Sequence, residues 1–202
     1  MTVQEDYYYT IDREANADFR DRGSRFIAYA SPLKNKEDFR KRLADAKKEH
    51  PKSTHLCFAY RLGLDGSQFR VSDDGEPSGS AGRPILGQID SKKLTDVLVI
   101  VVRYFGGTLL GVPGLIHAYR SAAALSLQLV PVLQKPVEVS YTIVFDYTRV
   151  NEVMTILKKN QCSVTDREMQ LFCRLQIGIP RNRLDEVLFS LQGLPNLEML
   201  KT

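Results

Sequence analysis

Alternating apolar and polar positions predict four strands in the first part of the chain. These strands cover residues 7–11, 25–30, 54–61 and 68–72. Residues 13–22 form a polar stretch between the first two strands. Residues 63–66, which begin and end with glycine, separate the last two strands and predict a hairpin.

Helical spacing begins after Asn35, a residue type that caps helix N-termini. Phe39, Leu43 and Ala46 recur at intervals of four and three residues, and Lys and Arg occupy the opposite face. We expect an amphipathic helix here that ends before Pro51.

Residues 97–102 are six consecutive apolar residues, which predicts a central strand buried on both faces. A short helix is expected to start near Pro84, and a longer one to cover residues 113–128, because proline is favoured in a first turn. The stripe of the longer helix expected to pack inward comprises Leu115, Ala118, Ala122, Leu125 and Leu129. His117 and Arg120 lie on a different stripe, so we expect them beside the preceding glycine-rich stretch.

The pattern changes again after a proline-containing linker at residues 131–136. Strands are predicted at residues 137–145, 163–169, 171–179 and 197–200, and helices at 150–159 and 181–191. The order βαββαβ is that of the ferredoxin-like, split-βαβ arrangement. We therefore expect an α+β protein of two domains, residues 1–132 and 133–202.

Composition is that of a soluble globular protein. The 202 residues are 43% hydrophobic and 26% charged, which excludes a disordered or collagen-like chain. The longest stretch without Asp, Glu, Lys, Arg or His, residues 121–134, contains a proline and is shorter than the roughly 20 apolar residues of a membrane-spanning helix. The N-terminus is acidic and lacks the apolar segment of a secretory signal. We expect a cytoplasmic protein with no membrane association.

The net charge of +4 belongs to the first part of the chain, because residues 137–202 have eight basic and eight acidic residues. Any attraction for polyanions is therefore expected in the first domain, although the excess is smaller than in strongly basic nucleic-acid-binding domains. The three cysteines and three histidines match no disulfide framework, redox motif or zinc-site spacing. We expect reduced cysteines that pack in the interior, and no cofactor.

Two glycine-rich stretches, residues 72–84 and 103–114, each precede a predicted helix. Free backbone amides and the positive end of the helix dipole attract anions at such a position, and glycine lets a phosphate approach closely. We expect both stretches to converge on one concave, solvent-exposed surface for negatively charged ligands. The residues assigned to this surface are Arg83, Arg103, Tyr104, Gly106, Gly107, Gly111, Gly114, His117 and Arg120.

The carboxylates of the first stretch have two interpretations. Asp73, Asp74 and Glu76 could hold a divalent metal ion, as in a metal-assisted hydrolase acting on a phosphorylated or peptide substrate. They could instead form turns by binding their own backbone. The turn interpretation is favoured, because Asp and Pro-Ser-Gly segments form turns on their own and Glu76-Pro77 needs no ligand. Three negative charges would also repel a phosphate here unless a metal or Arg83 and Arg103 compensated them, so we expect a phosphate to meet the second stretch.

Arg103 and Tyr104 also have two interpretations, and the sequence favours neither. At the C-terminal end of a central strand they could offer a cation and a stacking ring to a ligand. Alternatively, Arg103 pairs with Asp73 or Asp74, and Tyr104 packs beneath the glycine-rich stretch.

These motifs, in this order, resemble the IMPACT family, in particular its bacterial YigZ-like members. The resemblance rests on Ser-Asp-Asp-Gly-Glu-Pro-Ser-Gly-Ser-Ala-Gly-Arg-Pro at residues 72–84, Val-Ile-Val-Val-Arg-Tyr-Phe-Gly-Gly-Thr-Leu-Leu-Gly at 99–111 and Gly-Leu-Ile-His-Ala-Tyr at 114–119. It covers approximately residues 20–130. The matching positions include Asp73, Asp74, Gly75, Glu76, Pro77, Gly82, Pro84, Arg103, Tyr104, Gly106, Gly107, Gly111, Gly114 and Tyr119.

Two positions depart from the family pattern. Pro113 stands where many relatives have another glycine, and His117 stands where many have arginine. A histidine has an unperturbed pKa of about 6.5 and is charged only part of the time, so it differs from a permanent anion clamp.

The resemblance implies a first domain with the ribosomal-protein-S-five domain-two-like fold. It implies a ferredoxin-like second domain similar to the last domain of elongation factor G. Members of the family are not established enzymes. Eukaryotic relatives bind a ribosome-associated activator of the amino-acid-starvation kinase, a partner that we do not transfer to this chain. Bacterial relatives are thought to bind nucleic acid or the ribosome.

We therefore expect a non-catalytic, translation-linked binding protein that associates with RNA or the ribosome and takes part in the regulation of translation. Two alternatives remain: the metal-assisted hydrolase, and a protein-interaction module that uses the exposed sheet of the second domain.

Overall fold

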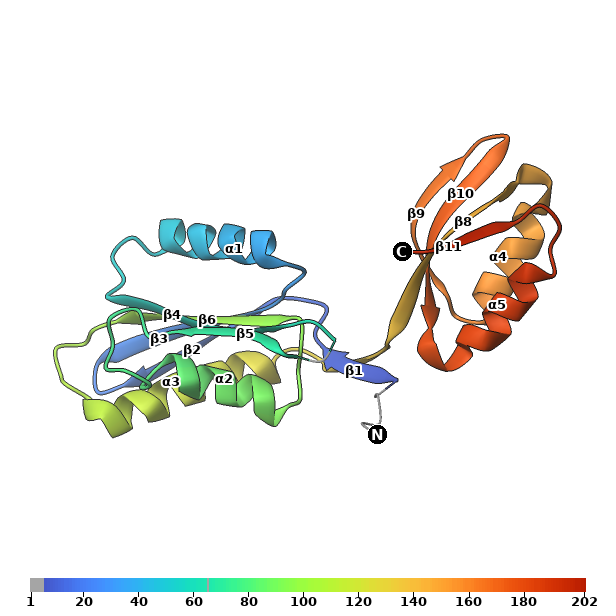
Figure 1. Cartoon of the computed structure of the whole chain (residues 1–202). Helices are drawn as coiled ribbons and strands as arrows, with labels where there is room; N and C mark the ends of the chain where they lie inside the picture. The colour runs from blue at the N-terminus through green and yellow to red at the C-terminus, as the bar shows by residue number, and fades with distance from the viewer. Residues whose placement is uncertain (1–5, 65) are drawn as a thin grey trace. The chain divides into compact units, whose positions relative to one another are not determined.

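The computed structural model describes residues 6–64 and 66–202, which divide into two compact units. One unit contains residues 8–135, and the other contains residues 136–202 together with 6 and 7. Both units combine strands and helices (Figure 1), which confirms the expected α+β class. In the described ranges, no helix is both long enough and apolar enough to cross a membrane.

The first unit is built on a five-stranded antiparallel sheet in the order β2-β3-β6-β4-β5. Its strands are β2 (Ala15–Asp21), β3 (Ser24–Pro32), β4 (His55–Leu62), β5 (Gln68–Ser72) and β6 (Val97–Tyr104). Helix α1 (Lys36–Glu49) covers one face, and α2 (Gly82–Ser91) and α3 (Gly111–Gln128) cover the other (Figure 1). The short strands β1 (Tyr7–Thr10) and β7 (Leu133–Pro136) pair with each other.

Strand β6 occupies the centre of this sheet, as its apolar run predicted. Val97, Val99 and Val101 face the core beneath α2 and α3, whereas residues 98, 100 and 102 face the core beneath α1. All six are buried, and burial of such a side chain contributes about 1.5–3 kcal/mol relative to exposure. The sheet is thereby fixed between two hydrophobic layers.

Helix α1 begins where its cap was predicted. The Oδ1 atom of Asn35 accepts a hydrogen bond from the Asp38 amide at 2.8 Å, and Phe39 and Ala46 are buried against the sheet. The helix ends at Glu49, before Pro51.

Three elements differ from the sequence-based expectations. The polar stretch contains edge strand β2, in which Ala15 and Phe19 pack on the core while Asn16 and Asp18 are exposed on the other face. The proline-containing linker contains β7. Helix α3 starts at Gly111, and its buried stripe includes Tyr119, Ala123, Ser126 and Leu127. Leu125 lies at the edge of that stripe and Leu129 lies beyond the helix, so both are exposed.

The second unit has the predicted element order βαββαβ. Its elements are β8 (Glu138–Asp146), α4 (Val150–Lys159), β9 (Ser163–Met169), β10 (Phe172–Pro180), α5 (Leu184–Gln192) and β11 (Glu198–Lys201). The antiparallel sheet has the order β11-β8-β10-β9. Helices α4 and α5 both pack on one face, where Val153, Leu157, Val187 and Leu191 meet apolar side chains of the sheet.

The cysteines lie in packed surroundings, as expected. Cys57 and Cys173 are buried, and Cys162 is half-buried. Burial raises the pKa of Cys57 to about 12 and that of Cys162 to about 11. These two thiols are therefore protonated at neutral pH and are poor nucleophiles.

Candidate functional site

The carboxylate of Asp73 organises the first glycine-rich stretch. Its Oδ2 atom accepts a hydrogen bond from the Gly79 amide at 2.8 Å, and its Oδ1 atom accepts bonds from the amides of Ala81 at 3.0 Å and Gly82 at 2.8 Å. Partial burial acts to raise the pKa of Asp73, but these amides and the charge of Arg83 outweigh it, so the pKa is lowered. The chain's own carboxylate therefore occupies amides that a phosphate would need.

The other two carboxylates are also engaged. Asp74 Oδ2 accepts a hydrogen bond from the Leu56 amide at 2.7 Å, and Glu76 pairs with Arg103. Among the residues that the structure describes, no group of three His, Cys, Asp or Glu side chains is arranged to hold a metal ion. These contacts support the turn interpretation of Asp73 and Asp74.

Asp73→Asn is expected to lower the free energy of unfolding at pH 7 by about 2–3 kcal/mol, because charge-assisted hydrogen bonds are lost. Folding lowers the pKa of this carboxyl, so its stabilising effect is fully present above the unfolded pKa of about 3.9 and is lost as the pH falls through the folded value. Urea unfolding of both proteins at neutral pH and at about pH 2.5 measures this. The difference in unfolding free energy between the two proteins should shrink in acid. An equal difference at both pH values would contradict a stabilising role of the Asp73 charge.

Glu76, Arg103 and Tyr119 form a polar cluster inside the first unit. Arg103 Nη1 donates to Glu76 Oε1 at 2.6 Å, and the Tyr119 hydroxyl donates to the same oxygen at 2.7 Å. The Glu76 and Arg103 side chains are 4% and 6% exposed, and Tyr119 is fully buried. Burial, with Cys57 and Glu76 nearby, raises the pKa of Tyr119 far above its usual value. The cluster links the two glycine-rich stretches through the interior.

The guanidinium of Arg103 lies between two aromatic rings. It is 5.5 Å from the ring centroid of Phe26 and 5.6 Å from that of Phe105. Its Nη2 atom also approaches Ser24 Oγ at 3.5 Å, and its Nε atom is buried with no hydrogen-bond partner among the described residues. Arg103 is thus an internal cation rather than a surface cation, because a buried carboxylate neutralises it. It lies outside the binding surface proposed below.

Tyr104 lies on the opposite face of the sheet from Arg103, because successive side chains of a strand alternate. Its hydroxyl bonds to His50 Nδ1 at 2.8 Å, and His50 Nε2 bonds to the Tyr29 hydroxyl at 2.7 Å. The Tyr29 hydroxyl donates to Glu49 at 3.2 Å, and burial together with Glu49 raises the pKa of Tyr29 to about 12. Tyr104 belongs to this chain of hydrogen bonds beside α1 and does not pack beneath the glycine-rich stretch.

The second glycine-rich stretch lies against the turn between β2 and β3. A Cβ atom on Gly106 would be 1.9 Å from the carbonyl carbon of Gly23, and the Gly106 amide donates to Ser24 Oγ at 3.2 Å. The amides of residues 107–109 have no hydrogen-bond partner in the described part of the chain. No side chain caps the N-terminus of α3 that follows. Free amide donors are therefore available to an anion here.

Three further glycines shape this stretch through their backbones. Gly107 and Gly111 have φ angles of 85° and 69°, a conformation that costs other residues about 1–2 kcal/mol. A Cβ atom on Gly114 would approach Leu110 Cβ at 3.0 Å. His117 follows on the exposed side of α3, with its ring 5.9 Å from that of Phe19.

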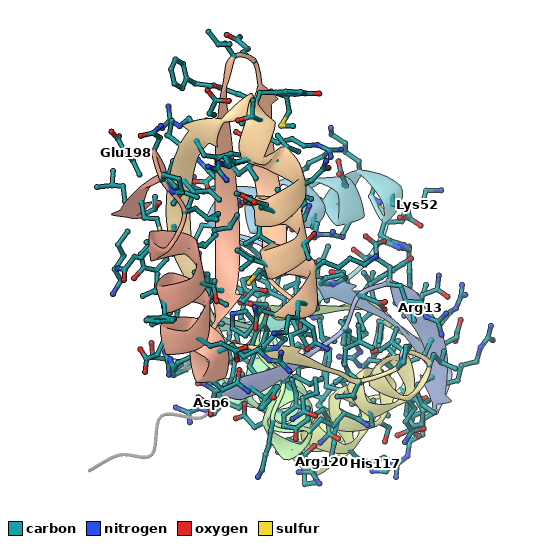
Figure 2. All side chains as sticks on the ribbon, turned by 90° about the vertical axis from the view of Figure 1, so that its right-hand side faces the viewer. Asp6, Arg13, Lys52, His117, Arg120 and Glu198 are labelled. Atoms are coloured by element: carbon teal, nitrogen blue, oxygen red, sulfur yellow. The ribbon has the colours of Figure 1, made fainter. Side chains whose placement is uncertain are left out.

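Arg83 and Arg120 flank a shallow, open groove between α2 and α3, which Gly79, Gly87 and Ile116 also line. Both arginines are exposed, and neither forms an ion pair with another described residue. Figure 2 shows Arg120 beside His117 at the outer surface. A Cβ atom at Gly87 would meet no other atom within 4 Å, so that wall is open. We call this feature the α2–α3 groove.

The two glycine-rich stretches do not both line the α2–α3 groove, although the sequence predicted one shared surface. The first stretch reaches it through Gly79 and Arg83, but residues 103–114 do not line it. Sequence reasoning missed Gly87 and Ile116. The available signal was helical spacing, because Gly87 follows Arg83 by four residues and Arg120 follows Ile116 by four, which places each pair on one face.

Comparison with known proteins agrees with the motifs. Residues 22–127 match the Impact N-terminal domain. An IMPACT family member of Haemophilus influenzae is 34% identical over 80% of both chains, and the IMPACT family member YigZ of Escherichia coli is 30% identical over 81% of both. A crystal structure of a hypothetical protein superposes with a TM-score of 0.74 at 26% identity and covers 98% of each chain. The chain therefore belongs to the IMPACT family.

Proposed function

We propose that this chain is a non-catalytic, translation-linked binding protein that associates with RNA in the cytoplasm, either free or within the ribosome, and so takes part in the regulation of translation. Family membership supports the link to translation. The observation that carries the proposal is the α2–α3 groove, in which Arg83 and Arg120 face solvent and form no ion pair with another described residue. Such guanidinium groups bind phosphate oxygens strongly.

The free amides of residues 107–109 provide a second phosphate contact in this proposal. They precede α3, whose N-terminus carries the positive end of a helix dipole. His117 lies one to two turns along the same helix, on its exposed side. The proposed RNA contacts are therefore Arg83, Arg120, His117 and the loop that contains Gly107 and Gly111.

The fold-level part of the proposal is that the first unit has the ribosomal-protein-S-five domain-two-like fold and the second the ferredoxin-like fold. The order βαββαβ and the sheet order β11-β8-β10-β9 support the second assignment. The hydrolase alternative is not favoured, because Asp73, Asp74 and Glu76 are already engaged by amides or by Arg103.

We expect Arg83→Ala combined with Arg120→Ala to weaken binding of the full chain to labelled single-stranded RNA. The dependence of log K on log salt should become shallower by about 1.4, since each single-strand phosphate contact contributes about 0.7. Fluorescence anisotropy over a salt series measures both quantities.

Arg40→Ala combined with Lys47→Ala is the matched control, because it removes two exposed cations from α1 on the other face of the sheet. Its salt dependence should stay close to that of the unchanged protein. Absent RNA binding, binding that does not vary with salt, or equal effects of the two pairs would each refute the α2–α3 groove as the RNA contact.

A further inference from the structure

The sheet of the second unit has one face that neither of its helices covers. Helices α4 and α5 pack against the face that carries Ile143, Phe145 and Leu175. Directly paired residues of antiparallel strands point to the same face, so the strand register identifies the opposite one. In the strand order β11, β8, β10 and β9, one row across this face consists of Glu198, Val144, Arg174 and Glu168. The next row consists of Leu200, Thr142, Gln176 and Asp166. A further pair on the same face is formed by Asp146 of β8 and Phe172 of β10. We call these ten residues the open sheet face.

Charge is distributed unevenly over residues 137–202, in which eight basic and eight acidic residues balance. The open sheet face holds four of the eight acidic residues of 137–202 but only one of the eight basic residues, Arg174. None of its four carboxylates forms an ion pair with another described residue. Basic side chains gather instead at the end of α4, where Arg183 donates to the Lys159 carbonyl at 3.3 Å beside Lys158.

The open sheet face also exposes large apolar side chains. Phe172 is 64% exposed and Leu200 is 71% exposed, and both lie among the carboxylates. Exposed apolar groups rimmed by polar ones are typical of interaction sites. Phosphate groups would be repelled by these four carboxylates, because no described cation neutralises them in an ion pair, which makes this face unsuitable for nucleic acid.

We propose that the open sheet face docks a basic segment of a partner protein, rich in Lys and Arg and carrying apolar side chains. The cations would meet Asp166, Glu168 and Glu198, and the apolar side chains would cover Phe172 and Leu200. Complementary charge of this kind selects a partner by sign and speeds association. A second copy of this chain is a weaker fit as the partner. Its basic residues lie at the end of α4, so docking them on the open sheet face would join the copies head to tail and would not form a closed dimer.

The test uses the full chain and a fluorescent peptide of about 12 residues with alternating Lys and Leu, the length of an extended segment that crosses a sheet. Saturable binding that weakens with salt is expected. Asp166→Asn combined with Glu168→Gln should weaken it about tenfold, since each exposed charge pair contributes up to about 1 kcal/mol. Phe172→Ala should weaken it without changing the salt dependence.

Asp185→Asn combined with Glu186→Gln is the matched control, because it removes the same two residue types from α5 on the other side of the unit. Little change in peptide binding is expected from it. Equal weakening by both pairs, no saturable binding, or equal binding of a peptide with Glu in place of Lys would overturn the proposal. So would self-association of the chain that the Asp166 and Glu168 substitutions abolish, since the occupant would then be a second copy.

The outcome is separable from that of the RNA proposal. The Asp166 and Glu168 substitutions should leave RNA affinity unchanged, and the Arg83 and Arg120 substitutions should leave peptide affinity unchanged. Either proposal can therefore fail while the other holds.

Discussion

Glu76→Gln is expected to lower the free energy of unfolding by about 3–5 kcal/mol, because it leaves the guanidinium of Arg103 buried without a compensating charge. Arg103 Nη1 lies 2.6 Å from Glu76 Oε1, and both side chains are more than nine-tenths buried. The Tyr119 hydroxyl can still donate to the new amide oxygen, so the loss is mainly electrostatic. Urea unfolding at neutral pH measures the change.

Arg103→Met added to Glu76→Gln removes the uncompensated charge, so the double variant should be more stable than Glu76→Gln alone. The matched surface control is Glu152→Gln, which removes an exposed ion pair with Arg149 and should cost less than about 1 kcal/mol. If Glu76→Gln cost no more than Glu152→Gln, the buried pair would have no special role in stability.

Gly106→Ala is expected to cost about 3 kcal/mol, at the upper end of overpacking effects. Its Cβ atom would lie 1.9 Å from the Gly23 carbonyl carbon and 2.2 Å from the Ser24 amide nitrogen, so one backbone segment must move. Because Ser24 Oγ contacts both the Gly106 amide and Arg103, the displacement should reach the buried cluster. Thermal or urea unfolding measures the loss, and amide NMR signals of residues 23 and 24 should shift.

The neighbouring glycine separates steric overlap from backbone strain. Gly107 has a φ angle of 85° but open space around it, so Gly107→Ala should cost only about 1–2 kcal/mol. A larger loss for Gly107→Ala than for Gly106→Ala would show that loop conformation, and not contact with the β2–β3 turn, determines the stability of this region.

The sequence predicted correctly those elements that depend on patterns of neighbouring residues. The cap at Asn35, the buried run at residues 97–102 and the order βαββαβ depend on residues close together in the chain, and the structure has all three. Edge strand β2 was missed because two of its three apolar residues are alanines and its exposed positions are polar or charged. The stripe of α3 was partly misplaced because only packing decides which apolar residues of a helix face the core.

The sequence by itself determined the secondary structure, the two-part organisation and the family motifs, since periodicity, capping and glycine spacing act over short distances along the chain. Only the tertiary structure decided what the motif residues do. Arg103 meets a carboxylate 27 residues away, and that carboxylate also binds Tyr119, 43 residues away. Such partners are set by the register of strands and the packing of helices, which no local pattern specifies. The same packing placed Arg83 and Arg120 on one groove and turned Tyr104 to the opposite face.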